Sequence, residues 1–362
     1  MVTSYDLLRR DEALYEGQEF YACILDEAQA IKNHTTQKYK AVCKVRSRVR
    51  FALTGTPVEN RLGELWSIFS FLMPGYLPPY KSFCSRFEKP IVQEEDQTAV
   101  RRLNQLTGPF ILRRMKSDVL KELPPKTENV YRIELEEEQR KLYLAAVVDA
   151  REKLQAAKPE DKMAVFAVLM RLREICCDPR LIADNWEGGS AKLDACAELV
   201  SSAVEGGHRI LLFSQFTSML ELLAKRLDAE GISHFTLQGS TPKPVRAELV
   251  RRFNGGEVSV FLISLRAGGT GLNLTAADIV IHYDPWWNVA AQNQATDRAY
   301  RIGQQNPVQV YKLIAQDTIE EKIVELQQAK QSLADTVTGT ADGAILSMRP
   351  DELLQLLEGS EP

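Results

Sequence analysis

Two adjacent carboxylates, Asp26 and Glu27, directly follow a short apolar stretch over residues 20–25. If that stretch is a strand of an open α/β sheet, both side chains lie at its carboxyl edge, where such folds bind ligands. An aspartate there can hold Mg²⁺, and a glutamate beside it can orient and deprotonate an attacking water. The same residues also suit a helix N-cap with an acidic first turn, and taken alone they favour that structural interpretation.

Small polar residues and glycines follow two other apolar stretches. Residues 53–57 read LTGTP, which predicts a tight polar turn and, in isolation, an ordinary loop between a strand and a helix. Residues 264–273 read SLRAGGTGLN, with three glycines in four positions. Such a run lets the backbone approach a phosphate or a sugar closely, and a purely structural turn needs fewer glycines. The second run therefore favours a ligand.

Arg298 and Arg301 lie in the segment 294–304, QATDRAYRIGQ. Their spacing of three predicts that they share one face of a helix. Paired guanidinium groups suit the negative charge that develops on a phosphoryl group during its transfer. The alternative is a pair of solvated surface arginines, which the flanking glutamines and glycine fit less well.

Alternating strands and helices must position these residues. The first 75 residues predict strands 20–25 and 49–53 and helices 35–45 and 62–72. Residues 81–187 are expected to be mostly helical, most clearly at 135–154 and 162–176. Five further strands then alternate with helices and predict a complete doubly wound sheet, at 209–214, 234–237, 258–264, 279–283 and 308–314. One amphipathic helix over 317–334 and a short one over 350–357 follow.

Composition narrows the class of protein. The 362 residues carry 45 Lys+Arg against 49 Asp+Glu, a net charge of −4, so any nucleic acid would need a local basic groove. None of the six cysteines forms a C-x-x-C pair, so we expect reduced thiols and no zinc knuckle. No secretory signal or membrane-spanning run is visible, which predicts a cytoplasmic protein.

The motifs occur in the order and spacing of helicase superfamily two. Residues 26–29 (DEAQ), 54–57 (TGTP), 268–271 and 294–304 resemble motifs II, III, V and VI. Longer phrases resemble the Swi/Snf family specifically; they are LTGTPVEN at 53–60, LRRMKSDVLKELPPK at 112–126, ILLFSQF at 210–216, GST at 239–241 and DPWWN at 284–288. The resemblance runs from Thr3 to about Ala334.

The resemblance implies an α/β fold of two RecA-like lobes, the first incomplete, with helical insertions and a C-terminal bracing helix. Residues 1–110 are expected to be the C-terminal part of lobe one, and residues 111–189 a helical linker and protrusion. Residues 190–316 are expected to form lobe two, and residues 317–362 the bracing helix and tail.

The resemblance also assigns roles to single residues. It implies that Asp26 is associated with Mg²⁺, that Glu27 activates water, and that Arg298 and Arg301 are arginine fingers with Gln294 as their companion. Residues implied in ATP binding or in its coupling to movement are Thr54, Gly55, Thr56, Gly269, Thr270, Gly271 and Asn273. Residues implied in DNA contact are Ser214, Gln215, Gln238, Gly239, Ser240, Ser264 and Trp287. Trp286 is expected to pack inward while Trp287 faces the DNA.

The implied activity is an ATP- and Mg²⁺-dependent motor that moves along double-stranded DNA and displaces DNA-bound proteins such as RNA polymerase, in the cytoplasm or on a bacterial nucleoid and without a membrane partner. The family's phosphate loop, G-K-[ST], is absent from these 362 residues. We therefore expect it upstream, and expect this chain alone to lack ATPase activity. A non-catalytic fragment that binds DNA or a partner is the alternative. Gln29 and Tyr300 stand where many relatives have His, and Val289 where many have Pro.

Overall fold

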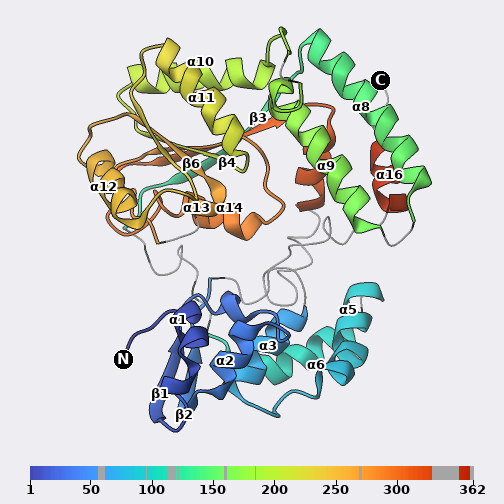
Figure 1. Ribbon diagram of the computed structural model, residues 1–362, viewed down its shortest axis with the longest axis vertical. Helices are drawn as coiled ribbons and strands as arrows, with labels where there is room; N and C mark the ends of the chain where they lie inside the picture. The colour runs from blue at the N-terminus through green and yellow to red at the C-terminus, as the bar shows by residue number, and fades with distance from the viewer. Residues whose placement is uncertain are drawn as a thin grey trace. The chain divides into compact units, whose positions relative to one another are not determined.

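The computed structural model describes residues 1–55, 62–94, 96–112, 114, 120, 122–158, 161–183, 185–268, 271–327 and 350–358. These residues form two compact units, each with its own core (Figure 1). Unit 1 contains Met1–Arg113; unit 2 contains Arg114–Leu326 and the C-terminal helix α16 (Pro350–Glu358). The domain boundaries expected from the sequence stay predictions.

Unit 1 is built on two parallel strands, which confirms both strands predicted for this part of the chain. The strand β1 (Glu19–Leu25) pairs with β2 (Arg46–Ala52) so that Leu25 lies opposite Ala52. Apolar side chains from one face of the pair pack on α1 (Tyr5–Arg10), α2 (Gln37–Lys44) and α3 (Leu62–Leu72). That core consists of Leu8, Leu25, Ala28, Ile31, Val42, Val45 and Phe71.

Several apolar side chains of the two strands in unit 1, and of the residue that follows β2, are exposed to solvent. Their exposed fractions are 76% for Tyr21, 62% for Ile24, 39% for Val49, 54% for Phe51 and 54% for Leu53. Both strands are apolar on successive residues, a pattern that suits strands covered on both faces. Within the described residues, Ile24, Val49 and Phe51, which share one face of the strand pair, lack this covering.

Short helices complete unit 1. They are α4 (Tyr80–Phe83), a π-helical turn (Cys84–Glu88), α5 (Lys89–Gln93) and α6 (Gln97–Thr107). Asp96 caps α6, because its Oδ1 accepts hydrogen bonds from Thr98 N and Ala99 N at 2.7 and 3.3 Å. These helices pack with α3 around a second core of large apolar side chains, namely Leu62, Leu65, Phe69, Leu77, Phe83, Phe87 and Leu103.

Unit 2 contains a parallel sheet of six strands in the order β3-β8-β7-β4-β6-β5. All five predicted strands are confirmed, as β4 (Ile210–Ser214), β5 (His234–Leu237), β6 (Val260–Ser264), β7 (Ile279–His282) and β8 (Val308–Ala315). The sixth strand, β3 (Lys126–Ile133), was missed, because it lies in a stretch expected to be mostly helical. Seven of its eight residues are exposed at the sheet edge, so it lacks an apolar run.

Alternate side chains of the central strands pack on opposite faces of the sheet, as the two-residue period of a strand requires. Ile210 and Leu212 face α10 (Ala191–Glu205) and α11 (Thr217–Ala229). Leu211 and Phe213 face the side that carries α12 (Lys243–Asn254), α13 (Leu265–Gly268) and α14 (Val289–Thr296). Figure 1 shows the two sets of helices on opposite sides of the strands.

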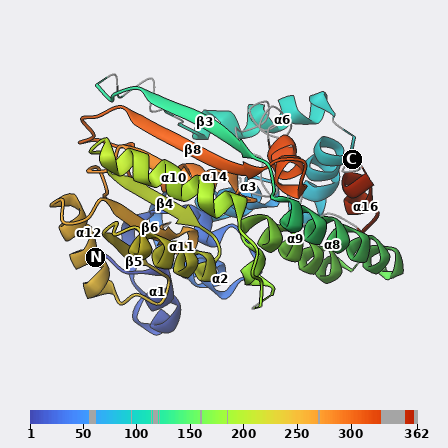
Figure 2. The same cartoon turned by 90° about the horizontal axis from the view of Figure 1, so that it is seen from above.

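Three helices pack together beside the sheet of unit 2 (Figure 2). The helices α8 (Glu137–Ala156) and α9 (Lys162–Cys177) form an antiparallel pair, and α16 lies against both. Arg151 Nη2 donates a hydrogen bond of 2.9 Å to the Leu357 carbonyl and fastens α16 to α8. Residues 319–327 are helical, as expected for the start of the bracing helix, and the remainder of that expected helix lies outside the described residues.

Glu128 holds the edge strand β3 on β8 by accepting hydrogen bonds from Lys126 and Lys312 at 2.6 and 2.7 Å. Burial raises the pKa of Glu128, but the two lysines outweigh burial and lower that pKa to about 2. The carboxylate therefore stabilises unit 2 above the unfolded-state pKa of about 4.3, and this contribution disappears as the pH falls through about 2.

We expect Glu128→Gln to lower the free energy of unfolding by about 1 kcal/mol at pH 7, after allowance for solvent screening of a side chain that is 36% exposed. Urea unfolding at pH 7 and pH 3 measures the effect, which should be smaller at pH 3. Glu325→Gln removes an exposed carboxylate paired with Lys322 and serves as the control. A loss of equal size at both pH values would contradict the role of the charge.

Candidate functional site

In unit 1 the predicted residues gather at the carboxyl ends of the two parallel strands. Asp26 and Glu27 follow β1, and Thr54 and Gly55 follow β2. Leu53 N donates to the Leu25 carbonyl at 2.7 Å, and Ala28 N donates to the Leu53 carbonyl at 2.9 Å. The parallel register therefore continues past both strand ends and brings the two loops together.

A chain of side-chain hydrogen bonds joins these two loops. Thr54 Oγ1 donates to Gln29 Oε1 at 2.8 Å, and Gln29 Nε2 donates to Glu27 Oε2 at 2.5 Å. Gln29, which departs from the histidine of many relatives, is thus the bridge between a carboxylate and a hydroxyl. The sequence analysis gave roles to Glu27 and Thr54 and none to Gln29, so the link through Gln29 comes from the structure.

The backbone of Glu27 lies in the left-handed region, with φ +51° and ψ +52°. For a residue with a side chain this conformation costs on the order of 1 kcal/mol, and such costs cluster at functional sites. Glu27 precedes the 3₁₀ turn Ala28–Ile31 but makes no side-chain capping bond with it. The alternative interpretation, an acidic helix cap, therefore has no support in the geometry of Glu27.

Asp26 and Glu27 are both exposed. Asp26 Oδ1 accepts a hydrogen bond of 3.0 Å from Glu27 N, and its backbone carbonyl accepts one of 2.7 Å from the Tyr5 hydroxyl. Burial, followed by the charge of Asp26, raises the pKa of Tyr5 to about 12. Tyr5 is thus a neutral donor that fixes the turn after β1. Thr56 lies outside the described residues.

In unit 2 several predicted DNA contacts lie at the carboxyl edge of the sheet, but their exposure differs. Ser214 and Ser264 end β4 and β6 and are only 1% and 4% exposed. Ser214 Oγ donates to Asp284 Oδ1 at 2.6 Å, so this hydroxyl is engaged inside the protein. Gln238 is half-buried, and Gly239 and Ser240 are exposed after β5.

Of the two neighbouring tryptophans, Trp286 packs inward as expected, but the expected orientation of Trp287 was wrong. Trp287 is only 8% exposed and packs with the core of α8 and α9. Its ring centroid lies 4.4 Å from Cζ of the buried Arg173, a cation–π contact. Trp286 is half-buried and packs on the side of the sheet that carries α12–α14. The predicted DNA-facing tryptophan therefore belongs to the interior of unit 2.

The expected shared helical face of the two arginines was also wrong, because α14 ends at Thr296. Turns follow, and the buried Gln304 fixes them by donating through Nε2 to the carbonyls of Ala277 and Ala299 at 2.7 and 3.2 Å. Arg298 is 7% exposed and Arg301 is half-buried. Gln294 is half-buried on α14.

The arginine segment lies against the loop that contains the glycine run. Arg301 Nη1 donates to the Leu272 carbonyl at 3.2 Å, and Leu274 N donates to the Arg298 carbonyl at 3.0 Å. In this loop Gly271 has φ +47°, and both Gly271 and Asn273 are exposed. The structure thus brings two predicted groups together, whereas Gly269 and Thr270 lie outside the described residues.

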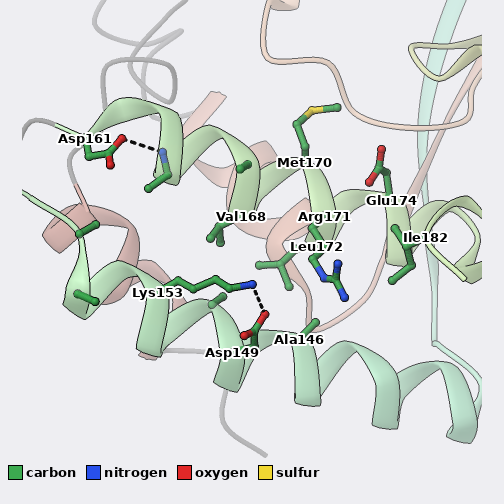
Figure 3. A pocket seen from close by; sticks show the side chains of 15 residues that line it. Ala146, Asp149, Lys153, Asp161, Val168, Met170, Arg171, Leu172, Glu174 and Ile182 are labelled. Carbon is green, nitrogen blue, oxygen red and sulfur yellow. Dashed lines mark hydrogen bonds and ion pairs between the residues drawn. The ribbon is translucent and has the colours of Figure 1, made fainter.

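A hollow of about 610 Å³ lies between α8 and α9, away from every predicted site residue (Figure 3). Alanines are the most frequent residues in its walls, and three of its polar side chains are engaged in bonds within the protein. Lys153 Nζ binds Asp149 at 2.7 Å, and Asp161 caps α9 by accepting from Ala164 N at 3.0 Å. We assign this hollow no function.

Among the described residues, no group of three His, Cys, Asp or Glu side chains could hold a metal ion by itself. The six cysteines are free thiols. A helix long and apolar enough to cross a membrane is also absent from the described part of the chain.

Comparisons with known proteins agree with this arrangement. Residues 1–181 match the SNF2-related domain, and residues 191–303 match the helicase conserved C-terminal domain. The chain is 40% identical to an uncharacterized ATP-dependent helicase of Mycoplasma pneumoniae, over 99% of this chain and 34% of that protein. It is also 40% identical to the putative ATP-dependent helicase/translocase YwqA of Bacillus subtilis, over 98% of this chain and 40% of that protein.

A solved structure with a similar fold is the SWI2/SNF2 ATPase core of Sulfolobus solfataricus in complex with double-stranded DNA. It has a TM-score of 0.55 and 35% identity, over 96% of this chain and 75% of that one. The chain spans only about a third of the length of the bacterial relatives named above. The family matches, the relatives and the similar structure agree, and the chain belongs to the SNF2 family of helicase superfamily two.

Proposed function

We propose that the full-length protein hydrolyses ATP and uses the energy to move along double-stranded DNA and displace proteins bound there. The observation that carries the proposal is the chain Glu27–Gln29–Thr54, which links an exposed carboxylate to the loop after the neighbouring strand. A change at the carboxylate can thereby shift the second loop, as a motor that couples chemistry to movement requires.

In this proposal Glu27 orients the attacking water and accepts its proton. Mg²⁺, bound by the exposed carboxylate of Asp26, supplies charge that offsets the phosphates. A single protein carboxylate fits this ion, because Mg²⁺ in such sites keeps several waters and takes its other ligands from the substrate phosphates. Gln29 and Tyr5 hold the two acidic residues in place.

Arg301 and Arg298 are proposed to stabilise the charge on the transferring phosphoryl group, with Gln294 beside them. Their contacts with Leu272 and Leu274 support a role for the loop 271–274 in binding the nucleotide or in passing its state to the DNA. Gly271 and Asn273 are its exposed members.

Gln215, Gln238, Gly239 and Ser240 are the proposed DNA contacts, because they lie at the carboxyl edge of the sheet and are exposed or half-buried. Ser214 and Ser264 are proposed to support these loops from within. The similar SWI2/SNF2 core is described in complex with double-stranded DNA, and another relative, MOT1 of Saccharomyces cerevisiae, is named a TATA-binding protein-associated factor. Both names favour a motor that acts on DNA and on DNA-bound protein.

Glu27→Gln in the full-length protein is expected to lower kcat for ATP hydrolysis by about 10² to 10⁴, with little change in KM. The amide keeps the shape of the side chain but cannot accept the proton. Steady-state ATPase assays with DNA, together with nucleotide binding, measure the effect. Glu19→Gln changes an exposed carboxylate at the start of the same strand and is the matched control.

Loss of ATP affinity with normal turnover of bound ATP would contradict this role of Glu27. The alternative, a non-catalytic fragment that only binds DNA or a partner, predicts no DNA-stimulated hydrolysis by the wild-type protein. Single-turnover assays with and without DNA distinguish the two functions.

A further inference from the structure

Arg173 is a fully buried charged side chain, with 0% exposure, on the helix α9. Its Nη2 lies 3.2 Å from Asp284 Oδ2 and 2.5 Å from the Pro285 carbonyl oxygen. The Asp284 side chain is 1% exposed, so both members of the ion pair are removed from water. The two charges lie between α9 and the loop after β7, and their removal from water there needs a physical reason.

Asp284 extends this contact to the loop after the neighbouring strand β4. Its Oδ1 accepts hydrogen bonds from Ser214 Oγ at 2.6 Å and from Gln215 N at 3.2 Å. Because β4 and β7 are adjacent and parallel, their following loops lie side by side. A single carboxylate therefore ties both loops together, and Arg173 ties that carboxylate to α9.

Two aromatic rings also lie close to the Arg173 guanidinium. Its Cζ lies 4.4 Å from the ring centroid of Trp287 and 5.6 Å from that of Phe216, one ring from each loop. Its Nε and Nη1 are buried without a hydrogen-bond partner in the protein. The two Nη2 contacts and the two rings together orient the group, a combination that a planar, forked guanidinium permits and an ammonium does not.

The loop held by Arg173 leads directly into α14. Asn288 Oδ1 caps this helix by accepting from Ala291 N at 2.6 Å. Trp286 N lies 3.5 Å from Gln292 Oε1, which ties the loop to the first two turns of the helix. The helix carries Gln294 and ends two residues before Arg298, so its position depends on the loop.

A buried ion pair is a poor device for stability alone, because well-packed apolar residues of similar volume often stabilise a protein as much or more. Desolvation raises the pKa of Asp284, and Arg173 opposes that rise. The burial of this pair therefore costs desolvation free energy. The pair lies where α9 meets the loops after β4 and β7. The location of this ion pair suits a role in holding the loops after β4 and β7 in one conformation.

We propose that Arg173 is a positioning residue of the ATPase: through Asp284, Pro285 and Trp287 it sets the loops after β4 and β7, and thereby the helix α14 that leads to Gln294 and Arg298. The inference rests on the proposed function, because it assigns Arg173 to the reaction proposed above. It adds a residue of α9, outside the predicted motifs, to those that determine turnover.

Arg173→Lys in the full-length protein tests the proposal, because lysine keeps the charge but loses the planar group. We expect kcat for DNA-stimulated ATP hydrolysis to fall about 10- to 100-fold while KM for ATP changes less than about twofold, since a small displacement of reacting groups costs turnover. Arg180→Lys is the matched control. Arg180 binds the buried carboxylate of Asp178 at 2.6 Å through Nη2, and its side-chain hydrogen bonds go to Asp178 and not to Asp284 or Pro285, so its kcat should stay within about twofold.

Acrylamide quenching of tryptophan fluorescence gives a second readout that a purely stabilising role would not change. Trp287 is 8% exposed, and Arg173→Lys should make it more accessible, whereas Arg180→Lys should not. Trp287→Phe identifies the part of the emission that belongs to Trp287. If Arg173→Lys does not fold, Asp284→Asn, which keeps the size of the side chain, takes its place with the same expected fall in kcat.

A normal kcat in a folded Arg173→Lys protein, or in Asp284→Asn where that replaces it, would overturn the proposal. An equal loss of kcat in Arg180→Lys would overturn it as well, because the effect would not depend on the two loops. Wild-type protein without DNA-stimulated hydrolysis would instead contradict the proposed function. In that case the quenching of Trp287 still decides whether Arg173 holds the loops.

Discussion

Arg301→Ala in the full-length protein is expected to lower kcat for ATP hydrolysis by about 10³-fold or more, the effect of removing an arginine finger. The side chain is half-buried, and its Nη1 bonds to the Leu272 carbonyl in the loop that follows the glycine run. Alanine removes the positive charge from this loop, so the charge on the transferring phosphoryl group would lose a stabilising partner.

Arg301 is a sharper test than Arg298, because Arg298 is only 7% exposed and its removal would also disturb packing. Arg251→Ala is the matched control: its side chain is 73% exposed on α12 and is paired with Glu248. DNA affinity should be retained in both variants, which fluorescence anisotropy with duplex DNA can measure. An unchanged kcat for Arg301→Ala would show that Arg301 does not act in hydrolysis and has only a structural role, through its hydrogen bond to the Leu272 carbonyl.

Elements with an apolar run or a clear helical period could be predicted from the sequence. All seven predicted strands are present, with ends that shift by a few residues, and the helix 62–72 has the predicted bounds. β3 was missed for a physical reason: its sequence, KTENVYRI, is mostly polar because it lies at an exposed edge of the sheet. A strand of this kind is specified by its neighbour β8, with which it pairs along eight residues.

The grouping of site residues could be predicted in part. The sequence placed residues 26–29 and Thr54 after two predicted strands, and parallel strands end at one edge of a sheet, which is where the structure brings them together. It did not predict that Gln29 bridges Glu27 and Thr54, because a side-chain hydrogen bond depends on rotamers that no periodicity specifies. The arginine spacing failed for a similar reason. Asp297 ends α14, and the buried Gln304 then fixes a series of turns.

The two tryptophans and Arg173 show that spacing along the sequence does not reveal which distant residues contact each other in the fold. Trp287 was expected to face the DNA because the family resemblance implied it, but a cation within α9 provides an interior partner for it. An arginine within the mostly apolar helix KMAVFAVLMRLREICC is a visible signal. The same helix carries Arg171, which is exposed, so the signal does not identify the buried charge, and the carboxylate that balances Arg173 lies 111 residues away in the sequence.

Unequal stability of the two units is the second large effect that we expect. In unit 2 the central strands β4, β6 and β7 are fully buried, with helices on both faces of the sheet. In the described residues of unit 1 two strands pair, and Tyr21, Ile24 and Phe51 are each more than half exposed. A sheet of two strands with one covered face gains little from burial and offers unpaired edges to other chains.

We therefore expect backbone amides of β4, β6 and β7 to exchange with solvent at least about 10³-fold more slowly than those of β1 and β2 in the purified 362-residue chain, a difference of about 4 kcal/mol in opening free energy. Hydrogen exchange followed by mass spectrometry measures this ratio. The exposed apolar face should also make the chain aggregate as its concentration rises, and Phe51→Thr should reduce that aggregation. Phe235→Thr alters a half-buried phenylalanine of β5 in unit 2 and should not.

The contacts of the unit 2 sheet decide where a stable fragment of this chain must begin. A fragment that begins at Ser190 lacks β3 and the helices α8 and α9, and with them the partners of β8, Asp284 and Trp287. A fragment that begins near residue 120 and ends at 358 keeps all three contacts. It should therefore be monomeric and better protected from exchange than the shorter one, which loses the Arg173–Asp284 ion pair, the ring contact with Trp287 and the edge strand β3. Protection of β1 and β2 equal to that of β4 would show that the exposed face of unit 1 does not weaken it.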